Sequence, residues 1–90
     1  MNLTCEISLY PLVEHYEATI IEVIKTLKKC DGVEVNTHAM STFLKGKSEK
    51  IFAALSTVYG LESMRSSPNA LVIKIINKDL PVEAGFLNFA

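Results

Sequence analysis

The feature that most constrains this chain is the order in which its apolar periodicity changes. Apolar and polar residues alternate over residues 3–9, whereas apolar residues recur every three or four positions over residues 13–29. Alternation is typical of a half-buried strand, and the longer period is typical of an amphipathic helix. The remaining pattern reads as strand, strand, helix and strand, at residues 33–40, 41–46, 48–60 and 70–77. The sequence therefore predicts the element order β-α-β-β-α-β.

Turn-forming residues separate these stretches. Pro11 ends the first strand, and the pair Asp31-Gly32 ends the first helix. A tight turn near Ala39 to Ser41 separates the second and third strands. Ser48 is a good N-cap residue for the second helix. Each boundary thus has a local chemical cause.

This element order favours an α+β fold of the ferredoxin-like type. Each strand-helix-strand crossover is expected to be right-handed, and the ferredoxin-like arrangement satisfies this with both helices on one face of a four-stranded antiparallel sheet. The first and third strands are then central. The other face of the sheet is left open, and we expect it to carry a mixture of polar and apolar side chains: Thr4, Glu6, Ser8, Val72, Lys74 and Ile76. Such a face is expected to be covered by another subunit, the C-terminal tail or a ligand.

The length of 90 residues is enough for one domain. We assign residues 1–90 to a single ferredoxin-like domain with its core at about 3–77 and a C-terminal tail at 78–90. The tail carries Phe86, Leu87 and Phe89, which would be costly to leave exposed. We therefore expect the tail to dock on a neighbouring subunit or to cap the sheet.

Charge and cysteine content exclude several functional classes. The net charge of -1 gives no electrostatic attraction to nucleic acid or to an acidic membrane. Cys5 and Cys30 form no C-x-x-C pair, so neither a disulfide framework nor a metal site is expected. The sequence shows no secretion signal and no apolar run long enough to span a bilayer. We expect a cytoplasmic protein with reduced thiols and no cofactor.

The pattern also disfavours catalysis. Ferredoxin-like acylphosphatases need a phosphate-binding loop with an arginine, but Arg65 is the only arginine, and no Gly-rich loop follows the first strand. RNA-binding versions of this fold have basic, aromatic-rich central strands, whereas "TCEISL" and "STFLKG" contain one aromatic residue between them. The sequence therefore favours a protein that is not an enzyme and does not bind nucleic acid.

Two segments carry a resemblance to a known family. "EISLYPL" at residues 6–12 and "MSTFLKG" at residues 40–46, each followed by a helix, resemble the YkoF-like family of small bacterial and archaeal domains. The resemblance implies a ferredoxin-like fold and binding of thiamine or its hydroxymethylpyrimidine moiety, in uptake, salvage or intracellular carriage. It also implies homodimers or homotetramers formed by sheet packing.

A site for such a ligand should combine a carboxylate, several hydroxyls and a flat or soft apolar surface. Glu6 and Ser8 on the first strand offer the first two kinds of group, and Ser41 and Thr42 add hydroxyls from the third. The candidate ligand-binding residues are Glu6, Ser8, Tyr10, His38, Met40, Ser41, Thr42 and Phe43. On this hypothesis "EISLY" and "MSTFLKG" form two walls of one pocket.

Structural roles for the same residues remain open. Glu6 could pair with Lys74 on the neighbouring strand, and Ser41 and Thr42 could simply shape the hairpin. Strict alternation cannot place Ser41 and Thr42 on the same face of the sheet. His38, just before the turn, is typical of a surface residue. The alternative function is an oligomeric interaction module with no small ligand, whose open face is filled by subunit contacts.

Overall fold

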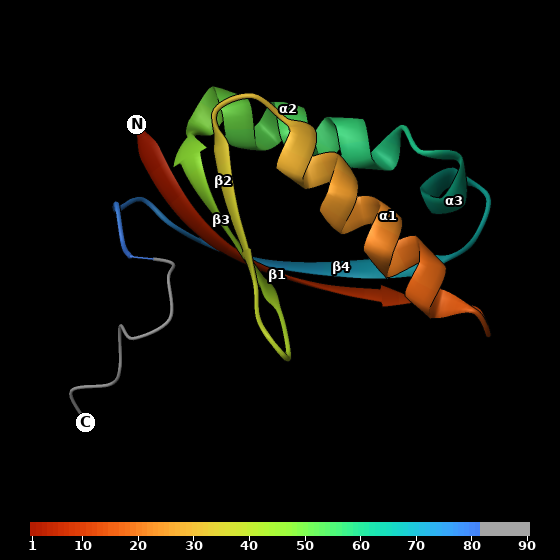
Figure 1. Ribbon diagram of the computed structural model, residues 1–90. Helices are drawn as coiled ribbons and strands as arrows, with labels where there is room; N and C mark the ends of the chain where they lie inside the picture. The colour runs from red at the N-terminus through yellow and green to blue at the C-terminus, as the bar shows by residue number, and fades with distance from the viewer. Residues whose placement is uncertain (82–90) are drawn as a thin grey trace.

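The computed structural model describes residues 1–81 and shows four strands and three helices (Figure 1). Their bounds are β1 Asn2–Pro11, α1 Tyr16–Lys29, β2 Val33–Thr37, β3 Thr42–Lys47, α2 Ser48–Tyr59, α3 Glu62–Arg65 and β4 Asn69–Ile76. The expected order β-α-β-β-α-β is confirmed, with the short α3 inserted after α2. Residues 82–90, which include Phe86, Leu87 and Phe89 of the predicted tail, lie outside the described residues.

The strands form one antiparallel sheet in the order β2-β3-β1-β4. β1 and β3 are therefore central, and α1 and α2 lie on the same side of the sheet (Figure 1). This is the predicted ferredoxin-like arrangement. Within residues 1–81, no helix combines the length and the apolar character needed to cross a bilayer.

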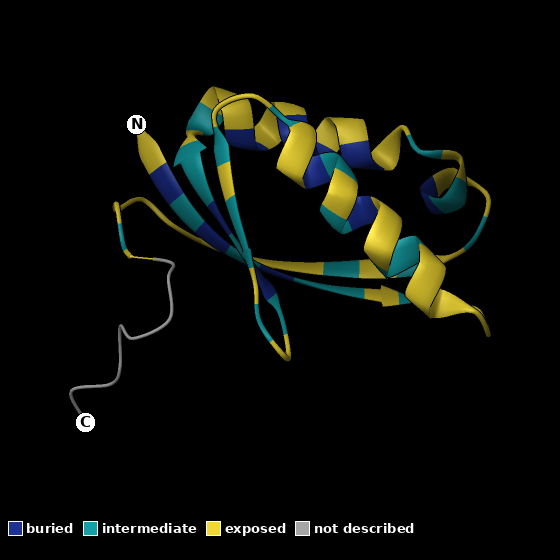
Figure 2. Cartoon of the chain, viewed as in Figure 1, coloured by how far each residue is buried: buried dark blue, intermediate teal, exposed yellow. Residues whose placement is uncertain are grey.

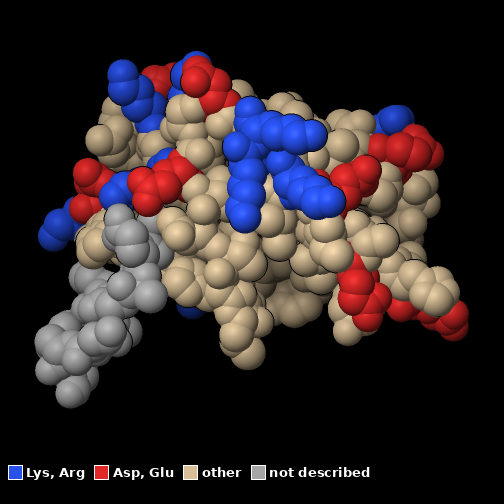
Figure 3. Space-filling model, in the orientation of Figure 1, with Lys and Arg blue, Asp and Glu red and all other residues tan. Residues whose placement is uncertain are grey.

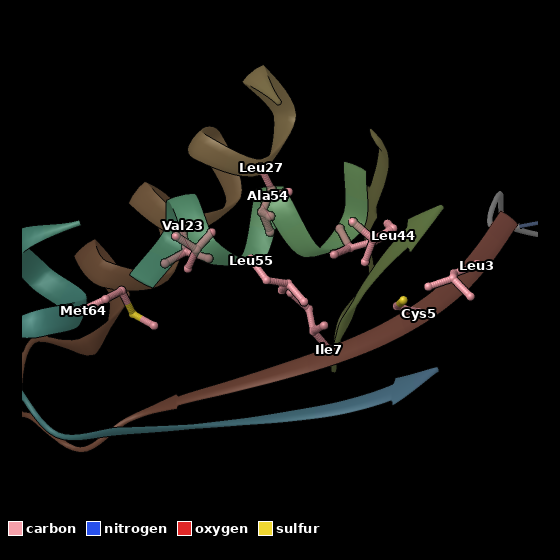
Figure 4. Close-up of a cluster of buried hydrophobic side chains, with 11 residues drawn as sticks. Leu3, Cys5, Ile7, Val23, Leu27, Leu44, Ala54, Leu55 and Met64 are labelled. Atoms are coloured by element: carbon pink, nitrogen blue, oxygen red, sulfur yellow. The ribbon is translucent and has the colours of Figure 1, made fainter. Parts of the chain in front are cut away.

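Alternation along β1 decides which side chains enter the core. Leu3, Cys5 and Ile7 are buried, while the residues between them are half-buried on the other face. Leu27 of α1 and Leu44 of β3 are fully buried in the same cluster (Figure 4). Burial raises the pKa of the Cys5 thiol, because the thiolate would lose its hydration. Cys5 is therefore a small residue of the core.

The open face has the predicted composition. On it, Glu6 lies directly opposite Lys74, and Ser8 lies opposite Val72. The helix-facing side of β4 is also incompletely covered, since Ile75 is 46% exposed there. Figure 2 shows the end of β4 exposed, while β1 beside it carries buried positions. β4 therefore presents apolar side chains on both of its faces.

Several predicted boundaries were wrong by a few residues. α1 begins at Tyr16 rather than at residue 13, and β2 ends at Thr37 rather than at Met40. Ser48 is not the N-cap of α2, because Lys47 occupies that position without a side-chain capping bond. Glu49 lies in the first turn of α2, and a hydrogen bond from its own backbone N–H lowers the pKa of its carboxyl group. A negative charge near a helix N-terminus stabilises the start of the helix.

Candidate functional site

The hairpin between β2 and β3 places two neighbouring hydroxyls on opposite sides of the sheet. The loop is closed by the His38 N–H, which donates to the Ser41 carbonyl oxygen at 2.8 Å. Ser41 Oγ donates to Glu6 Oε2 at 2.9 Å, so its side chain serves the open face. Thr42 is only 8% exposed and lies opposite Ile7 of the buried face of β1. The hairpin thus supplies one hydroxyl to each face.

A groove of about 270 Å³ lies on the open face. We call it the open-face groove; it is lined by Thr4, Cys5, Glu6, Phe43, Lys74, Ile75, Ile76, Leu80 and Pro81. The Glu6 carboxylate uses both oxygens, since Oε1 lies 3.5 Å from Lys74 Nζ while Oε2 accepts from Ser41. The pairing of Glu6 with Lys74, one of the two roles that the sequence left open for Glu6, is present in the structure.

Leu80 and Pro81 in this lining belong to the segment 78–81, which we call the strap. The Thr4 hydroxyl donates to the Lys78 carbonyl oxygen at 2.7 Å and accepts from the Leu80 N–H at 3.0 Å. Lys45 Nζ lies 3.0 Å from the Asp79 carboxylate and donates to the Leu80 carbonyl oxygen at 3.1 Å. Side chains of β1 and β3 therefore hold the strap against the sheet.

A second, smaller cavity lies on the other side of the sheet, between α1 and the hairpin. This helix-side cleft has a volume of about 150 Å³ and is lined by Ile7, Leu9, Ile20, Val23, Ile24, Leu27, Thr37, His38, Ala39, Met40, Ser41 and Thr42. Its polar feature is a pair of hydroxyls, with Thr37 Oγ1 and Thr42 Oγ1 3.5 Å apart. A cavity of about 150 Å³ accepts one benzene ring, so the cleft is the size of a single six-membered ring.

The helix-side cleft is uncharged. None of the described residues that line it is Lys, Arg, Asp or Glu. Figure 3 shows lysine side chains gathered over α1, whose last turn carries Lys28 and Lys29, whereas the hairpin lies in the uncharged part of this face. The cleft therefore suits a neutral ring better than an anion.

A family model for the YKOF-related family matches residues 2–75. The chain belongs to this family. Three solved structures similar to this YkoF-related chain are a hypothetical protein from Methanocaldococcus jannaschii, a "putative thiamine biosynthesis/salvage protein" from Thermotoga maritima and a protein from Streptococcus pneumoniae. No curated protein matches the chain.

The structural likeness supports the fold assignment. The M. jannaschii protein has a TM-score of 0.72 at 23% identity, covering 87% of this chain and 81% of that one. The T. maritima protein has a TM-score of 0.76 at 17% identity, covering 91% of each chain. The S. pneumoniae protein has a TM-score of 0.76 at 19% identity, covering 89% of this chain and 90% of that one. At these identities the likeness establishes a shared fold and nothing finer.

The structure divides the predicted site residues of this YkoF-related chain between the two cavities. Glu6 and Phe43 line the open-face groove, whereas His38, Met40, Ser41 and Thr42 line the helix-side cleft. Ser8 and Tyr10 line neither of these two cavities. "EISLY" and "MSTFLKG" both contribute to each cavity, with Glu6 and Phe43 at the open-face groove and Ile7, Leu9 and Thr42 at the helix-side cleft. The candidate residues themselves are divided between the two cavities, because alternation sends adjacent residues to opposite faces.

The hairpin residues themselves have different surroundings. The ring of His38 lies 4.6 Å from the ring of Phe43, tilted by 43°, so the two form an aromatic contact across the hairpin. Met40 at the hairpin tip is 90% exposed, although it borders the cleft.

Within residues 1–81, His, Cys, Asp and Glu side chains form no group of three that could hold a metal ion.

The sequence analysis missed several residues of the helix-side cleft. Thr37 faces Thr42 in the β2–β3 register, and Ile20 and Ile24 come from α1. The alternating pattern of the hairpin could have paired the two threonines once the turn was placed. The two isoleucines were recognisable only as part of the apolar face of a helix.

Proposed function

We propose that this chain is a non-enzymatic binding protein for thiamine or its hydroxymethylpyrimidine moiety, acting in uptake, salvage or carriage. The observation that carries the proposal is the helix-side cleft, a ring-sized apolar cavity with the Thr37–Thr42 hydroxyl pair in its lining. Membership of the YkoF-related family supports it, as does the fold shared with the T. maritima protein named for thiamine biosynthesis or salvage.

The hydroxyl pair matches the hydrogen-bonding edge of an aminopyrimidine. Each hydroxyl has one proton and two lone pairs, and the contact between Thr37 and Thr42 uses one proton and one lone pair. One donor and several acceptor sites remain. An aminopyrimidine presents an amino donor beside a ring-nitrogen acceptor, so it can bond both hydroxyls at once.

The size of the cleft decides which part of thiamine is inside. Apolar side chains from both layers, including Ile24 of α1 and Leu9 of β1, supply the walls for one flat ring. The cationic thiazolium ring does not fit in the same volume. We place it outside the cleft, next to Met40, whose flexible thioether can adapt to a flat ring.

A binding role fits the chemistry of the lining. The described lining residues include no carboxylate and no cysteine. The Ser41 hydroxyl is committed to Glu6 on the other face, and the ring of His38 packs against the ring of Phe43. A nucleophile activated by a base needs both groups within hydrogen-bond reach of the substrate. The cleft therefore supports retention of a ring rather than its conversion.

Calorimetric titration with hydroxymethylpyrimidine, thiamine and thiamine phosphate tests this proposal. Hydroxymethylpyrimidine and thiamine should each bind with saturable one-site heat. Thr42→Val keeps the shape of the side chain but removes its hydroxyl, and should weaken binding about 10-fold or more, because a bound polar edge loses its partner. Thr57→Val, on the exposed face of α2, is the matched control and should bind like the parent chain.

The same titration contains results that would contradict the proposal. If none of the three compounds gives binding heat at millimolar concentration, a thiamine-related ligand is rejected. Weakening by Glu6→Gln but not by Thr42→Val would keep the ligand and move it to the open-face groove. Circular dichroism of each variant establishes that the fold is retained.

The oligomeric interaction module is supported by a separate observation. Among the described strands β4 pairs only with β1, so its second edge is unpaired, and Ile73 and Ile75 on its helix-facing side are exposed. A second copy paired along this edge would extend the sheet and cover these side chains. We propose a homodimer of this kind, with the homotetramer as its higher assembly.

Sedimentation equilibrium tests the proposed dimer. Ile75→Lys places a charge in the proposed interface and should shift the dimer toward monomer by at least about 10-fold in dissociation constant. Ile21→Lys makes the same change on the exposed outer side of α1 and should leave the assembly unchanged. Equal behaviour of the two variants would contradict an interface along β4.

A further inference from the structure

The tip of the β2–β3 hairpin, residues 38–41, extends beyond the last strand pairs on either side of β3 (Figure 1). The β1–β3 ladder ends with the pair Ile7 and Thr42, and the β2–β3 ladder ends with Thr37 and Thr42. The tip nevertheless forms part of the helix-side cleft, since residues 37–42 are six of its twelve lining residues. The position of the tip therefore sets the width of the cleft.

We propose that Glu6 is a positioning residue for the helix-side cleft, although its carboxylate lies on the opposite face of the sheet. The carboxylate accepts the Ser41 hydroxyl at 2.9 Å, one residue beyond the last pair of the β1–β3 ladder. This bond ties the tip to β1, the strand that also supplies Ile7 and Leu9 to the cleft. The inference rests on the proposed binding function and adds how that site keeps its shape.

The chemistry of the bond suits this role. A hydrogen bond to a carboxylate is stronger than one between neutral groups. The side chain of Glu6 is only 36% exposed, on a central strand between β3 and β4. Lys74 Nζ lies 3.5 Å from the other carboxylate oxygen, and its side chain is 79% exposed, so this ion pair adds little. The stronger of these two contacts of Glu6 is therefore the one that reaches the hairpin.

Two contacts within the hairpin make the tip move as one unit. The His38 N–H donates to the Ser41 carbonyl oxygen at 2.8 Å, and the ring of His38 packs against the ring of Phe43. Fixing Ser41 therefore also fixes the two residues between it and His38. Without the tie to Glu6 the tip can swing about its base, and the ring-sized cleft exists in only a fraction of the molecules. The apparent affinity then falls by that fraction.

Calorimetric titration with hydroxymethylpyrimidine measures the effect on the cleft. Ser41→Ala and Glu6→Leu each remove the bond and should each weaken binding by at least about 5-fold. The double variant should bind no more weakly than the weaker of the two single variants, because both changes break the same bond. Glu6→Gln keeps an acceptor oxygen for the Ser41 hydroxyl, so its affinity should stay within about 2-fold of the parent chain.

Two matched controls accompany these variants. Lys74→Met removes the ion pair of Glu6 but leaves the bond to the hairpin, and Ser56→Ala removes a serine hydroxyl on the exposed side of α2. Both should bind like the parent chain. A loss of affinity in Lys74→Met equal to that in Glu6→Leu would overturn the positioning role, because it would show that the charge pair matters and not the tie.

NMR relaxation dispersion of the Ala39 methyl group separates positioning from direct contact with a ligand. It is measured without ligand and detects motion on the microsecond to millisecond timescale. Ser41→Ala and Glu6→Leu should each introduce dispersion that the parent chain, Glu6→Gln and Lys74→Met lack. The methyl group of Ala54, buried in the core, is the internal reference and should be unchanged.

The two measurements give different results for the two ways of failing. Parent-like relaxation of Ala39 in both Ser41→Ala and Glu6→Leu would overturn the tie, whatever binds. Equal loss of affinity in Glu6→Gln and Glu6→Leu would also overturn it, because an acceptor oxygen would then not be sufficient. If no compound binds the parent chain but Ala39 still separates the variants, the tie is supported and the thiamine-related ligand is rejected.

Discussion

Gly46→Ala should lower the free energy of unfolding by at least about 3 kcal/mol. This corresponds to a decrease of about 15 °C in the melting temperature of the protein. A Cβ atom at Gly46 would lie 2.4 Å from the carbonyl oxygen of Gly32 and 3.6 Å from the Cα atom of Val33. Both contacts are with backbone. Gly32 is itself fixed in a left-handed conformation at φ 76°. The only relief is to separate β2 from β3, which breaks the ladder that holds the edge strand.

Gly60→Ala is the matched control for this prediction. Gly60 ends α2 in a right-handed conformation, and a Cβ atom there would lie 3.3 Å from the nearest backbone oxygen. We expect a change of less than about 1 kcal/mol, because the lower entropy of the unfolded chain offsets a tight contact. Chemical denaturation of both variants measures the difference. Similar midpoints for the two would contradict a close β2–β3 approach at Gly46.

Ile24→Trp should strongly weaken ligand binding without loss of stability. The larger side chain fills the helix-side cleft that we assign to the pyrimidine ring. Binding of hydroxymethylpyrimidine should weaken by at least about 30-fold, or about 2 kcal/mol. The melting temperature should stay equal or rise, since filling a cavity adds apolar contact. Calorimetry and thermal unfolding measure the two effects on the same sample.

Ile21→Trp provides the control for the cleft-filling variant. It makes the same change one turn away on the exposed side of α1 and should leave binding intact. The chain has no tryptophan of its own, so fluorescence reports where each new ring lies. Emission should be blue-shifted for Trp in the cleft and red-shifted for Trp at position 21. Full binding by Ile24→Trp with blue-shifted emission would place the ligand elsewhere.

The fold was predictable because each element has a strong local pattern. The alternation of Leu3, Cys5 and Ile7 identified both β1 and the face that it buries. The face of β4 that carries Lys74 was correctly predicted to be the open one, because a lysine is costly to bury. Ser48 failed as a cap since an N-cap preference is statistical, and here the strand continues to Lys47 before the helix begins.

The candidate site was less predictable because cavities depend on packing between distant segments. The sequence correctly implied that Ser41 and Thr42 serve different faces, but it could not say that each face has its own cavity. The helix-side cleft depends on how closely α1 packs against the hairpin, which no pattern within α1 reveals. The bonds from Thr4 and Lys45 to the strap join residues more than 30 positions apart, and nothing local to either partner indicates them.

The position of β1 in the sheet also determines how the chain must be assembled in time. β1 is a central strand, yet both of its neighbours, β3 and β4, are synthesised after it. Thr4 pairs with Ile76, and at about 5–20 residues per second this partner is made roughly 4 to 14 s later. The pairing joins residues 72 positions apart. The conformational entropy of closing this long loop is therefore lost only at a late step of folding. During synthesis β1 therefore remains without its strand partners for longer than any other strand of the described sheet. The sheet is completed only after β4 has been synthesised.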